Sequence, residues 1–448
     1  MALRLVSLAA FSLSVAWGFD ITRYDNTVVY WGQNSIGAAS TTPSSEYQKP
    51  LAFYCEDDAV DMFPIAFVDT FFSTGGLPSL NLANTCNPTD NATFAGTDLP
   101  NCASLASDIE TCQSAGKLVT ISLGGAGGGV GFSSDAQATT FAQTIWDLFL
   151  GGSSTTRPFG TAVLDGIDLD IEGGSGTSYA AFVNKIRSLS SGASKQYYVT
   201  AAPQCVYPDA SLGSVLNTAD FDAIFVQFYD NPCGLTTYPT VSDWDFGIWD
   251  QWAATLSPNP NVRVFIGAPA SSSAAGSGYV DIETLSNIAV TMRQNFPSFG
   301  GVMLWDESQA YQNDRFDLAI KNALVAAGGT GFTYPACSAP TWESTGIYEG
   351  GAQVSYQGYI YQAKWYASST PALNPNGDWS AISACGGASV PPASTTTTAT
   401  STIKTTTTTT TTSTSTSSTS SATAGSCAGV PAWTSTAIFV GGDQATYK

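Results

Sequence analysis

Short hydrophobic runs recur along the first two thirds of the chain, and longer polar or amphipathic segments separate them. Several runs are apolar throughout, which is typical of parallel β-strands buried on both faces. The runs that predict strands cover residues 27–31, 63–71, 117–123, 162–172, 197–202, 221–229, 262–268 and 300–305. Their even spacing predicts one large domain in which strands alternate with other elements.

Segments with helical periodicity lie between some of these strands. Over residues 179–189 the apolar side chains recur at helical spacing and predict a helix with a core-facing stripe. Eight strands within about 280 residues, each followed by a crossover, predict an α/β fold, a (β/α)8 TIM barrel over residues 19–330. An open doubly wound sheet is the alternative, but no Gly-x-Gly-x-x-Gly phosphate loop follows the first strand.

The run at 162–172 is apolar on one face and acidic on the other. Side chains alternate across a strand, so Asp168, Asp170 and Glu172 share a face. Like charges about 6–7 Å apart raise one another's pKa, which can keep a carboxylic acid protonated near neutral pH. Glycoside hydrolysis requires such an acid. A Ca²⁺ site or a solvated edge strand is the alternative, but Ca²⁺ loops usually carry Gly and Asn rather than β-branched residues.

Charge and composition exclude several classes of function. The 448 residues carry a formal net charge of −20, which argues against nucleic acid or an anionic membrane as partner and suits a neutral polymer. The sequence has no histidine, so Ser-His-Asp triads, Cys-His dyads and His-ligated zinc are excluded. The nine cysteines form no Cys-x-x-Cys pair, which argues against zinc and redox motifs. We therefore expect no metal and no cofactor.

The first 18 residues have the pattern of a secretory signal peptide. Arg4 precedes an apolar run at 5–16, and small residues end the segment at Gly18. The run is too short to span a membrane, and no other segment is long and apolar enough. We expect a secreted, extracellular monomer, and association with a cell wall is compatible with this. The sequon at 91–93 predicts N-glycosylation.

The composition changes after the predicted barrel. Residues 337–386 are rich in aromatics without helical periodicity and predict a small β module closed by one disulfide. Residues 387–426 are almost entirely Ser and Thr and predict a disordered, O-glycosylated linker. Residues 427–448 repeat the start of the aromatic module and stop before its second cysteine. We interpret them as a truncated second module; a natural or designed short ending is the alternative.

Two motifs resemble those of a known family. DGIDLDIE at 165–172 resembles the D-x-x-D-x-D-x-E signature of glycoside hydrolase family 18 chitinases, and SLGG at 122–125 resembles their S-x-G-G motif. The resemblance covers about residues 25–325. Similarity to the class III branch (plant and fungal, hevamine-like) rests on YWGQN at 30–34, QFY at 227–229 and LW at 304–305.

The resemblance implies a retaining mechanism in which the substrate's own 2-acetamido oxygen is the nucleophile. Glu172 would be the general acid and then the base, and Asp170 would orient the acetamido group. Asp168 would share a proton with Asp170. Tyr229 would hydrogen-bond the acetamido carbonyl, and Trp305 would form the floor of the reacting subsite. The further substrate contacts it implies are Tyr30, Phe67, Gly125 and Gln227.

The acids' placement along a single strand supports this interpretation, because they approach the sugar from one side. An ordinary retaining glycosidase instead uses two carboxyl groups on opposite sides of the bond. Asp165 has the opposite strand parity, so we expect a structural hydrogen-bonding role for it. Asp230 stands where class III members often have Asn, which changes the charge near the expected cleft.

The resemblance also extends to the cysteines and to the aromatic module. The module is similar to small chitin-binding modules, which implies sugar contacts by Trp342, Trp365 and Tyr366. Many such modules have a second Trp where this chain has Tyr366. The implied disulfides are Cys55–Cys112, Cys86–Cys102, Cys205–Cys233 and Cys337–Cys385.

Together these observations predict a secreted chitinase that hydrolyses the β-1,4-N-acetylglucosamine linkages of chitin. One alternative with the same chemistry is an endo-β-N-acetylglucosaminidase acting on N-glycans. Another is a non-catalytic chitin-binding protein of the cell wall. The complete acidic motif favours an enzyme, and the aromatic module favours insoluble chitin over N-glycans as substrate.

Overall fold

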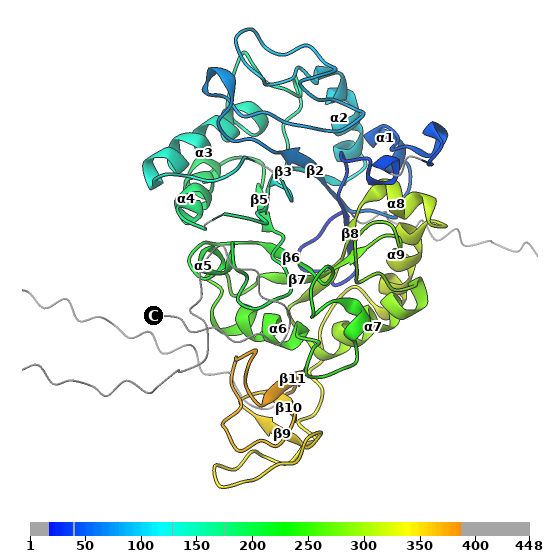
Figure 1. Cartoon of the computed structure of the whole chain (residues 1–448), viewed down its shortest axis with the longest axis vertical. Coiled ribbons are helices and arrows are strands. Elements are labelled where there is room, and N and C mark those ends of the chain that lie inside the picture. The colour runs from blue at the N-terminus through cyan, green and yellow to red at the C-terminus, as the bar shows by residue number, and fades with distance from the viewer. Residues whose placement is uncertain (1–17, 39–40, 128, 175, 387–448) are drawn as a thin grey trace, which may run out of the picture. The chain divides into compact units, whose positions relative to one another are not determined.

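A parallel β-barrel forms the body of the protein. The computed structural model describes residues 18–38, 41–127, 129–174 and 176–386, and within them eight parallel strands close in the order β1 to β8 (Figure 1). The predicted (β/α)8 barrel is therefore confirmed. The expected signal peptide up to residue 17, the Ser/Thr-rich linker and the second aromatic module lie outside the described residues. The barrel strands are β1 (Asn26–Val29), β2 (Met62–Val68), β3 (Leu118–Gly124), β4 (Gly166–Asp170), β5 (Tyr198–Ala201), β6 (Ala223–Gln227), β7 (Arg263–Pro269) and β8 (Phe299–Trp305).

Each predicted strand run overlaps one of these strands, and the strands are buried along nearly their whole length. The register aligns polar groups across neighbouring strands. Asp168 on β4 lies opposite Ser122 on β3 and Thr200 on β5. Strand β4 ends at Asp170, so Glu172 stands two residues beyond it, at the carboxyl end of the barrel.

Helices surround the strands in Figure 1. The predicted helix at 179–189 is α4, whose apolar stripe is buried against the barrel except for the partly exposed Leu189. The α-helices are α1 (Leu51–Tyr54), α2 (Ala106–Ser114), α3 (Asp135–Phe149), α4 (Tyr179–Ser190), α5 (Gly213–Leu216), α6 (Phe246–Thr255), α7 (Ile282–Asn295), α8 (Glu307–Gln312) and α9 (Phe316–Ala327). The short 3₁₀ helices are η1 (Ser35–Ala38), η2 (Ser44–Glu46), η3 (Thr74–Gly76), η4 (Ala103–Leu105) and η5 (Leu235–Thr237).

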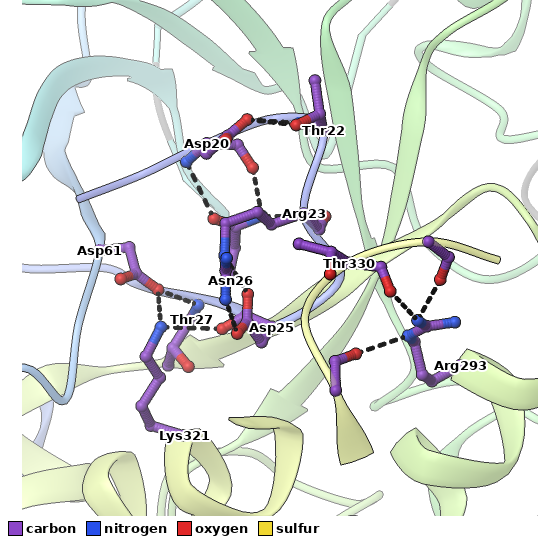
Figure 2. Close-up of polar contacts among 12 residues, drawn as sticks. Asp20, Thr22, Arg23, Asp25, Asn26, Thr27, Asp61, Arg293, Lys321 and Thr330 are labelled. Carbon is purple, nitrogen blue, oxygen red and sulfur yellow. Dashed lines mark hydrogen bonds and ion pairs between the residues drawn. The ribbon is translucent and has the colours of Figure 1, made fainter. Parts of the chain in front are cut away.

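Polar contacts hold the amino-terminal end of the barrel (Figure 2). The Asn26 side chain donates to the carbonyls of Asp20 (2.9 Å) and Arg23 (3.2 Å). Asp61 accepts from the Thr27 amide (2.7 Å) and the Lys321 ammonium (2.6 Å), joining β1 to α9. These contacts fix the segment before β1, whose apolar side chains pack on the barrel interior. In barrels of this type such contacts at the amino-terminal end support stability, which leaves the carboxyl end for chemistry.

A three-stranded antiparallel sheet follows the barrel, in the order β11-β10-β9. Its strands are β9 (Gln353–Tyr356), β10 (Tyr359–Ala363) and β11 (Trp379–Ala384). The structure forms the four disulfides that the resemblance implied: Cys55–Cys112, Cys86–Cys102, Cys205–Cys233 and Cys337–Cys385. Within the described residues no helix combines the length and apolarity needed to cross a membrane.

Candidate active site

The acidic residues of β4 meet polar side chains from the neighbouring strands at the carboxyl end of the barrel. Asp168 is completely buried and accepts three hydroxyl hydrogen bonds of 2.7 Å each, from Tyr30, Ser122 and Thr200. Burial raises its pKa, and these three hydroxyls partly offset that rise. Because both of its oxygens are engaged by hydroxyls, Asp168 has the environment of a buried support rather than of a metal ligand.

Asp170 lies one step nearer the end of the strand and is 4% exposed. Gln227, at the end of β6, donates from Nε2 to Asp170 Oδ1 at 2.8 Å. The pKa of Asp170 stands well above its ordinary value, chiefly because of burial and then because of the charges of Glu172 and Asp168. The contacts of Asp168 go to hydroxyls and that of Asp170 to Gln227, so the proton sharing between the two stays a prediction.

Glu172 is partly buried and lines a cavity of about 470 Å³. Burial raises its pKa, and the carboxylates of Asp230 and Asp209 add to the effect. A carboxylic acid in such surroundings stays protonated at higher pH than a free one, which suits proton donation to a leaving group. Asp170, Gln227 and Tyr229 line the same cavity.

Aromatic rings form one wall of this cavity. Phe67 stacks on Trp305 with ring centroids 5.7 Å apart and planes 17° apart, and Tyr30 lies 5.6 Å from Trp305. Gly125 is required beside them: its φ is +84°, and a Cβ there would lie 2.8 Å from Phe67 Cδ2. Its amide also donates to the Asp170 carbonyl at 2.8 Å. The S-x-G-G segment thus brings the aromatic wall and the acidic strand close together.

Tyr229 follows β6 and is 9% exposed on the cavity. Its pKa is well above the ordinary value because of burial and then of the charges of Asp170 and Glu172. The phenol is therefore held as a neutral hydroxyl that can donate a hydrogen bond to a ligand. The structure brings all the expected substrate contacts of the barrel to this cavity, namely Tyr30, Phe67, Gly125, Gln227, Tyr229 and Trp305.

Several residues on the cavity surface were not expected from the sequence. Gln33, Asp69, Asn81, Gln204 and Asn231 all line it. They lie in loops that follow β1, β2, β5 and β6. Their position at the carboxyl ends of barrel strands, where active sites of such barrels lie, is the one signal that could have indicated all five. Gln33 lies within the YWGQN segment that carries the class III resemblance, whereas no motif singled out the other four as cavity residues.

Asp165 lies outside the cavity and has a structural role, as its strand parity suggested. It is 6% exposed, pairs with the Lys195 ammonium at 2.9 Å and accepts from the Gln113 side chain and the Val119 amide at 2.8 Å. These contacts join the start of β4 to β3 and to α2. They anchor the strand whose other end carries the acids.

The three aromatic residues expected to contact sugar, which lie in the loops around the C-terminal sheet, occupy two kinds of position. Trp342 is partly buried against Tyr356, with ring centroids 5.2 Å apart. Trp365 and Tyr366 are 48% and 56% exposed. Trp365 Nε1 donates to Asp378 Oδ1 at 2.9 Å, which fixes its ring. Sugar contact by these side chains stays a prediction, and Trp365 and Tyr366 have the exposure for it.

Comparison with known proteins agrees with this geometry. The model of the family described as Glycosyl hydrolases family 18 matches residues 26–275, which include the acidic strand and, from the aromatic wall, Tyr30 and Phe67. The chain belongs to glycosyl hydrolase family 18. The match ends before β8, so the Trp305 side of the cavity comes from outside the matched residues.

Proteins named as chitinases are similar to this chain over longer stretches than the family model. Chitinase 2 of Rhizopus oligosporus is 46% identical over 323 residues, which are 72% of this chain and 56% of that protein. Endochitinase 33 of Trichoderma harzianum is 38% identical over 332 residues, 71% of this chain and 98% of that protein. Among solved structures, the ICChI chitinase from Ipomoea carnea matches with a TM-score of 0.54 and 32% identity, covering 66% of this chain and 99% of that one. The chain thus spans little more than half of the length of its Rhizopus relative.

Proposed function

We propose that this chain is a secreted chitinase that hydrolyses β-1,4 linkages between N-acetylglucosamine units with retention of configuration. One observation carries the proposal: Asp170 at the end of β4 and Glu172 just beyond it line one cavity together with Gln227, Tyr229 and the aromatic wall. The buried Asp168 precedes them on the same strand. Membership of family 18 and the names of its chitinase relatives support the reaction and the substrate.

In the first step Glu172 donates its proton to the glycosidic oxygen while the carbonyl oxygen of the 2-acetamido group attacks C1. The C1–O bond breaks, the leaving sugar departs as an alcohol, and a cyclic oxazolinium ion forms. Asp170 accepts a hydrogen bond from the acetamido N–H and offsets the positive charge of the ring. Tyr229 donates to the acetamido carbonyl oxygen and holds it in line with C1. Asp168 supports Asp170 from behind.

In the second step the carboxylate of Glu172 removes a proton from water, whose oxygen attacks C1 and opens the oxazolinium ring. Two displacements at C1 retain the β configuration. The stacked rings of Phe67 and Trp305 give the sugar an apolar surface against which its C–H groups can pack. Side chains of the enzyme thus position the substrate, while Glu172 gives up one proton in the first step and takes one up in the second.

Asp69 and Asp230 also line the cavity, and either carboxylate could serve as a general base in an inverting mechanism, which is the competing chemistry. If either activated a water on the opposite face of the sugar, hydrolysis would invert the configuration. The anomer formed first from chitotetraose, followed by proton NMR, separates the two. We expect the β anomer first and no cleavage of the corresponding β-1,4-glucan, which lacks the acetamido group. An α anomer first, or equal cleavage of the glucan, would disprove the substrate-assisted step.

Substrate and location are tested in the same preparation. We expect release of soluble oligosaccharides from chitin and no release of the N-glycan from a high-mannose glycoprotein; the reverse would favour the endo-β-N-acetylglucosaminidase alternative.

Secretion is supported by the four disulfides of the described residues, because disulfides persist in oxidising compartments. Recovery of the protein only from the reduced cytosol would contradict secretion.

A further inference from the structure

Two amide side chains on the surface of the active-site cavity have no part in the proposed mechanism. Gln204 lies in the loop after β5 and Asn231 in the loop after β6, and both line the cavity. Both residues are partly exposed. A molecule bound in the cavity can therefore contact them directly.

Hydrogen bonds fix the direction in which each amide faces. Asn231 Nδ2 donates to the backbone carbonyl of Tyr229 at 3.2 Å and to Gln204 Oε1 at 3.3 Å. A backbone carbonyl can only accept, so the Asn231 atom that contacts it must be the nitrogen. The Gln204 atom that accepts from this nitrogen must then be its oxygen. Gln204 Nε2 and Asn231 Oδ1 take no part in these contacts and remain as a donor and an acceptor for a ligand.

The backbone on both sides of the pair is held in place. The Gln204 amide donates to Asp209 Oδ2 at 3.0 Å, and Gln204 pairs with Gln227 in a parallel bridge. The Cys205–Cys233 disulfide joins the two loops beside the pair. A donor and an acceptor held in this way lose little conformational freedom when a ligand binds, which favours recognition of a specific group.

The pair and most of the aromatic wall lie on different sides of β4. In the closed strand order β5 and β6 follow β4, whereas Tyr30 and Phe67 belong to β2 and the end of β1, which precede it. In the proposed mechanism Glu172, just beyond β4, protonates the oxygen between the reacting sugar and the leaving sugar. With the reacting sugar packed on the aromatic wall, the leaving sugar lies toward Gln204 and Asn231.

The free atoms of the pair complement an acetamido group. This group has one acceptor, its carbonyl oxygen, and one donor, its N–H. Gln204 Nε2 can donate to the carbonyl oxygen while Asn231 Oδ1 accepts from the N–H. A hydroxyl group donates and accepts through a single atom, whereas the acetamido group presents the two functions on separate atoms, as the pair does.

We propose that Gln204 and Asn231 recognise the acetamido group of the leaving sugar, so that the enzyme selects N-acetylglucosamine on that side of the scissile bond. This inference rests on the proposed function for the reaction and for the place of the reacting sugar. The substrate-assisted step requires an acetamido group on the reacting sugar but none on the leaving sugar. The amide pair supplies this second selection.

Three substrates that share a chitotriosyl unit and differ only in the leaving group test the proposal. The leaving group is N-acetylglucosamine in chitotetraose, glucose in the analogue that ends in glucose, and nitrophenol in the chromogenic glycoside. Release of this group gives kcat/KM for each substrate. Gln204→Met keeps the length of the side chain and removes the donor. We expect it to lower kcat/KM for chitotetraose by about three- to tenfold and to leave the other two values within twofold.

A second variant, Gln204→Glu, keeps the oxygen that accepts from Asn231 and removes only the donor. Its added charge acts on all three substrates alike, so the preference for chitotetraose over the glucose-ended analogue isolates the lost contact. We expect this preference to fall about three- to tenfold as well. The control is Gln362→Met, which breaks a similar amide pair outside the cavity, where Gln353 Nε2 donates to Gln362 Oε1 at 3.2 Å. It should leave all three values unchanged.

Equal losses on all three substrates would reduce the pair to a structural support of Tyr229 and overturn the inference. Wild-type kcat/KM for chitotetraose in both folded Gln204 variants would also overturn it. In either case, cleavage of the chromogenic glycoside by the wild type would keep the proposed function. If the wild type cleaved none of the three substrates, the proposed function would fail, and this inference would fail with it.

Discussion

The environment of Glu172 determines the pH range over which it can act as an acid. Burial is the largest cause of its raised pKa, and Asp230 is the next. Asp230 is held in place by the Ser277 amide, which donates to its Oδ1 at 2.6 Å, and it has a positive φ of 53°. The residue that stands where class III members often have Asn therefore raises the pKa of the carboxyl group that we propose as the catalytic acid.

Replacing Asp230 with Asn removes this negative charge and should lower the pKa of Glu172. The protonated acid would then be lost at lower pH, so the alkaline limb of the kcat/KM profile should move down by roughly 0.5–1 pH. Initial rates on a chromogenic chitotriose glycoside across pH 4–9 measure this shift. Asp220→Asn, an exposed aspartate paired with Arg187, is the control and should leave the profile unchanged. An unmoved limb in Asp230→Asn would exclude the electrostatic coupling.

At the scale of elements, most strands of the barrel could be predicted from the sequence, whereas the contact between the barrel and the C-terminal sheet could not. The strand runs were predictable because strands buried on both faces are apolar along their whole length, and α4 was predictable because its burial follows a period of 3.6 residues. The acids of β4 were predictable because three carboxylates on one strand face are rare without a use. By contrast, Gln204 and Asn231 reach the active-site cavity from loops whose shape depends on long-range contacts.

Local sequence patterns also do not predict that the C-terminal sheet packs on α6, although one signal in the sequence of α6 points to it. Phe246 to Ala253 are buried all around the helix, which includes the polar Asp250 and Gln251. A helix buried on every face must be covered by something besides the barrel. Tyr359 and Tyr361 supply that cover, from a segment about 100 residues further along the chain.

Gly247 offers a direct test of this docking. A Cβ at that position would lie 2.0 Å from the Ala381 carbonyl oxygen on β11, so Gly247→Val forces α6 and β11 apart. We expect a loss of about 1–3 kcal/mol in the free energy of unfolding and faster proteolysis of the C-terminal sheet. Urea unfolding and limited proteolysis measure the two effects. Ala254→Val, at an exposed position near the C-terminal end of α6, is the control. Equal stability of the two variants would contradict the close packing.

At the scale of the whole molecule, acidic groups dominate the electrostatics. The net charge is −20, and the pKa values of several buried carboxyl groups are raised chiefly by burial. These groups are Asp168, Asp170, Asp250, Asp306 and Glu307. Ionisation is easier for them in the unfolded chain. Their contribution to stability is therefore fully present below the unfolded pKa, near 4, and is lost as the pH rises through the folded values.

The protein should consequently be more stable in mildly acidic than in mildly alkaline solution. We expect Tm at pH 5 to exceed Tm at pH 8 by about 2–5 °C, and repulsion among the surface carboxylates acts in the same direction. Scanning calorimetry at constant ionic strength measures the difference, and repeating it in 0.5 M salt separates surface repulsion from the buried groups. A higher Tm at pH 8 would contradict raised pKa values for these buried carboxyl groups.

In the proposed mechanism Glu172 supplies and recovers the catalytic proton. The most direct test is single-turnover and steady-state cleavage of a chitotriose glycoside by the wild type and by Glu172→Gln, with oligosaccharide binding measured alongside. We expect the kcat of Glu172→Gln to be at least about a thousandfold lower than that of the wild type. One positioned acid contributes roughly 10²–10⁴ in rate, and Glu172 acts in both steps. Binding should stay within a few-fold of the wild type. If the kcat of Glu172→Gln stayed within tenfold of the wild-type value, Glu172 would not be the residue that supplies and recovers the proton.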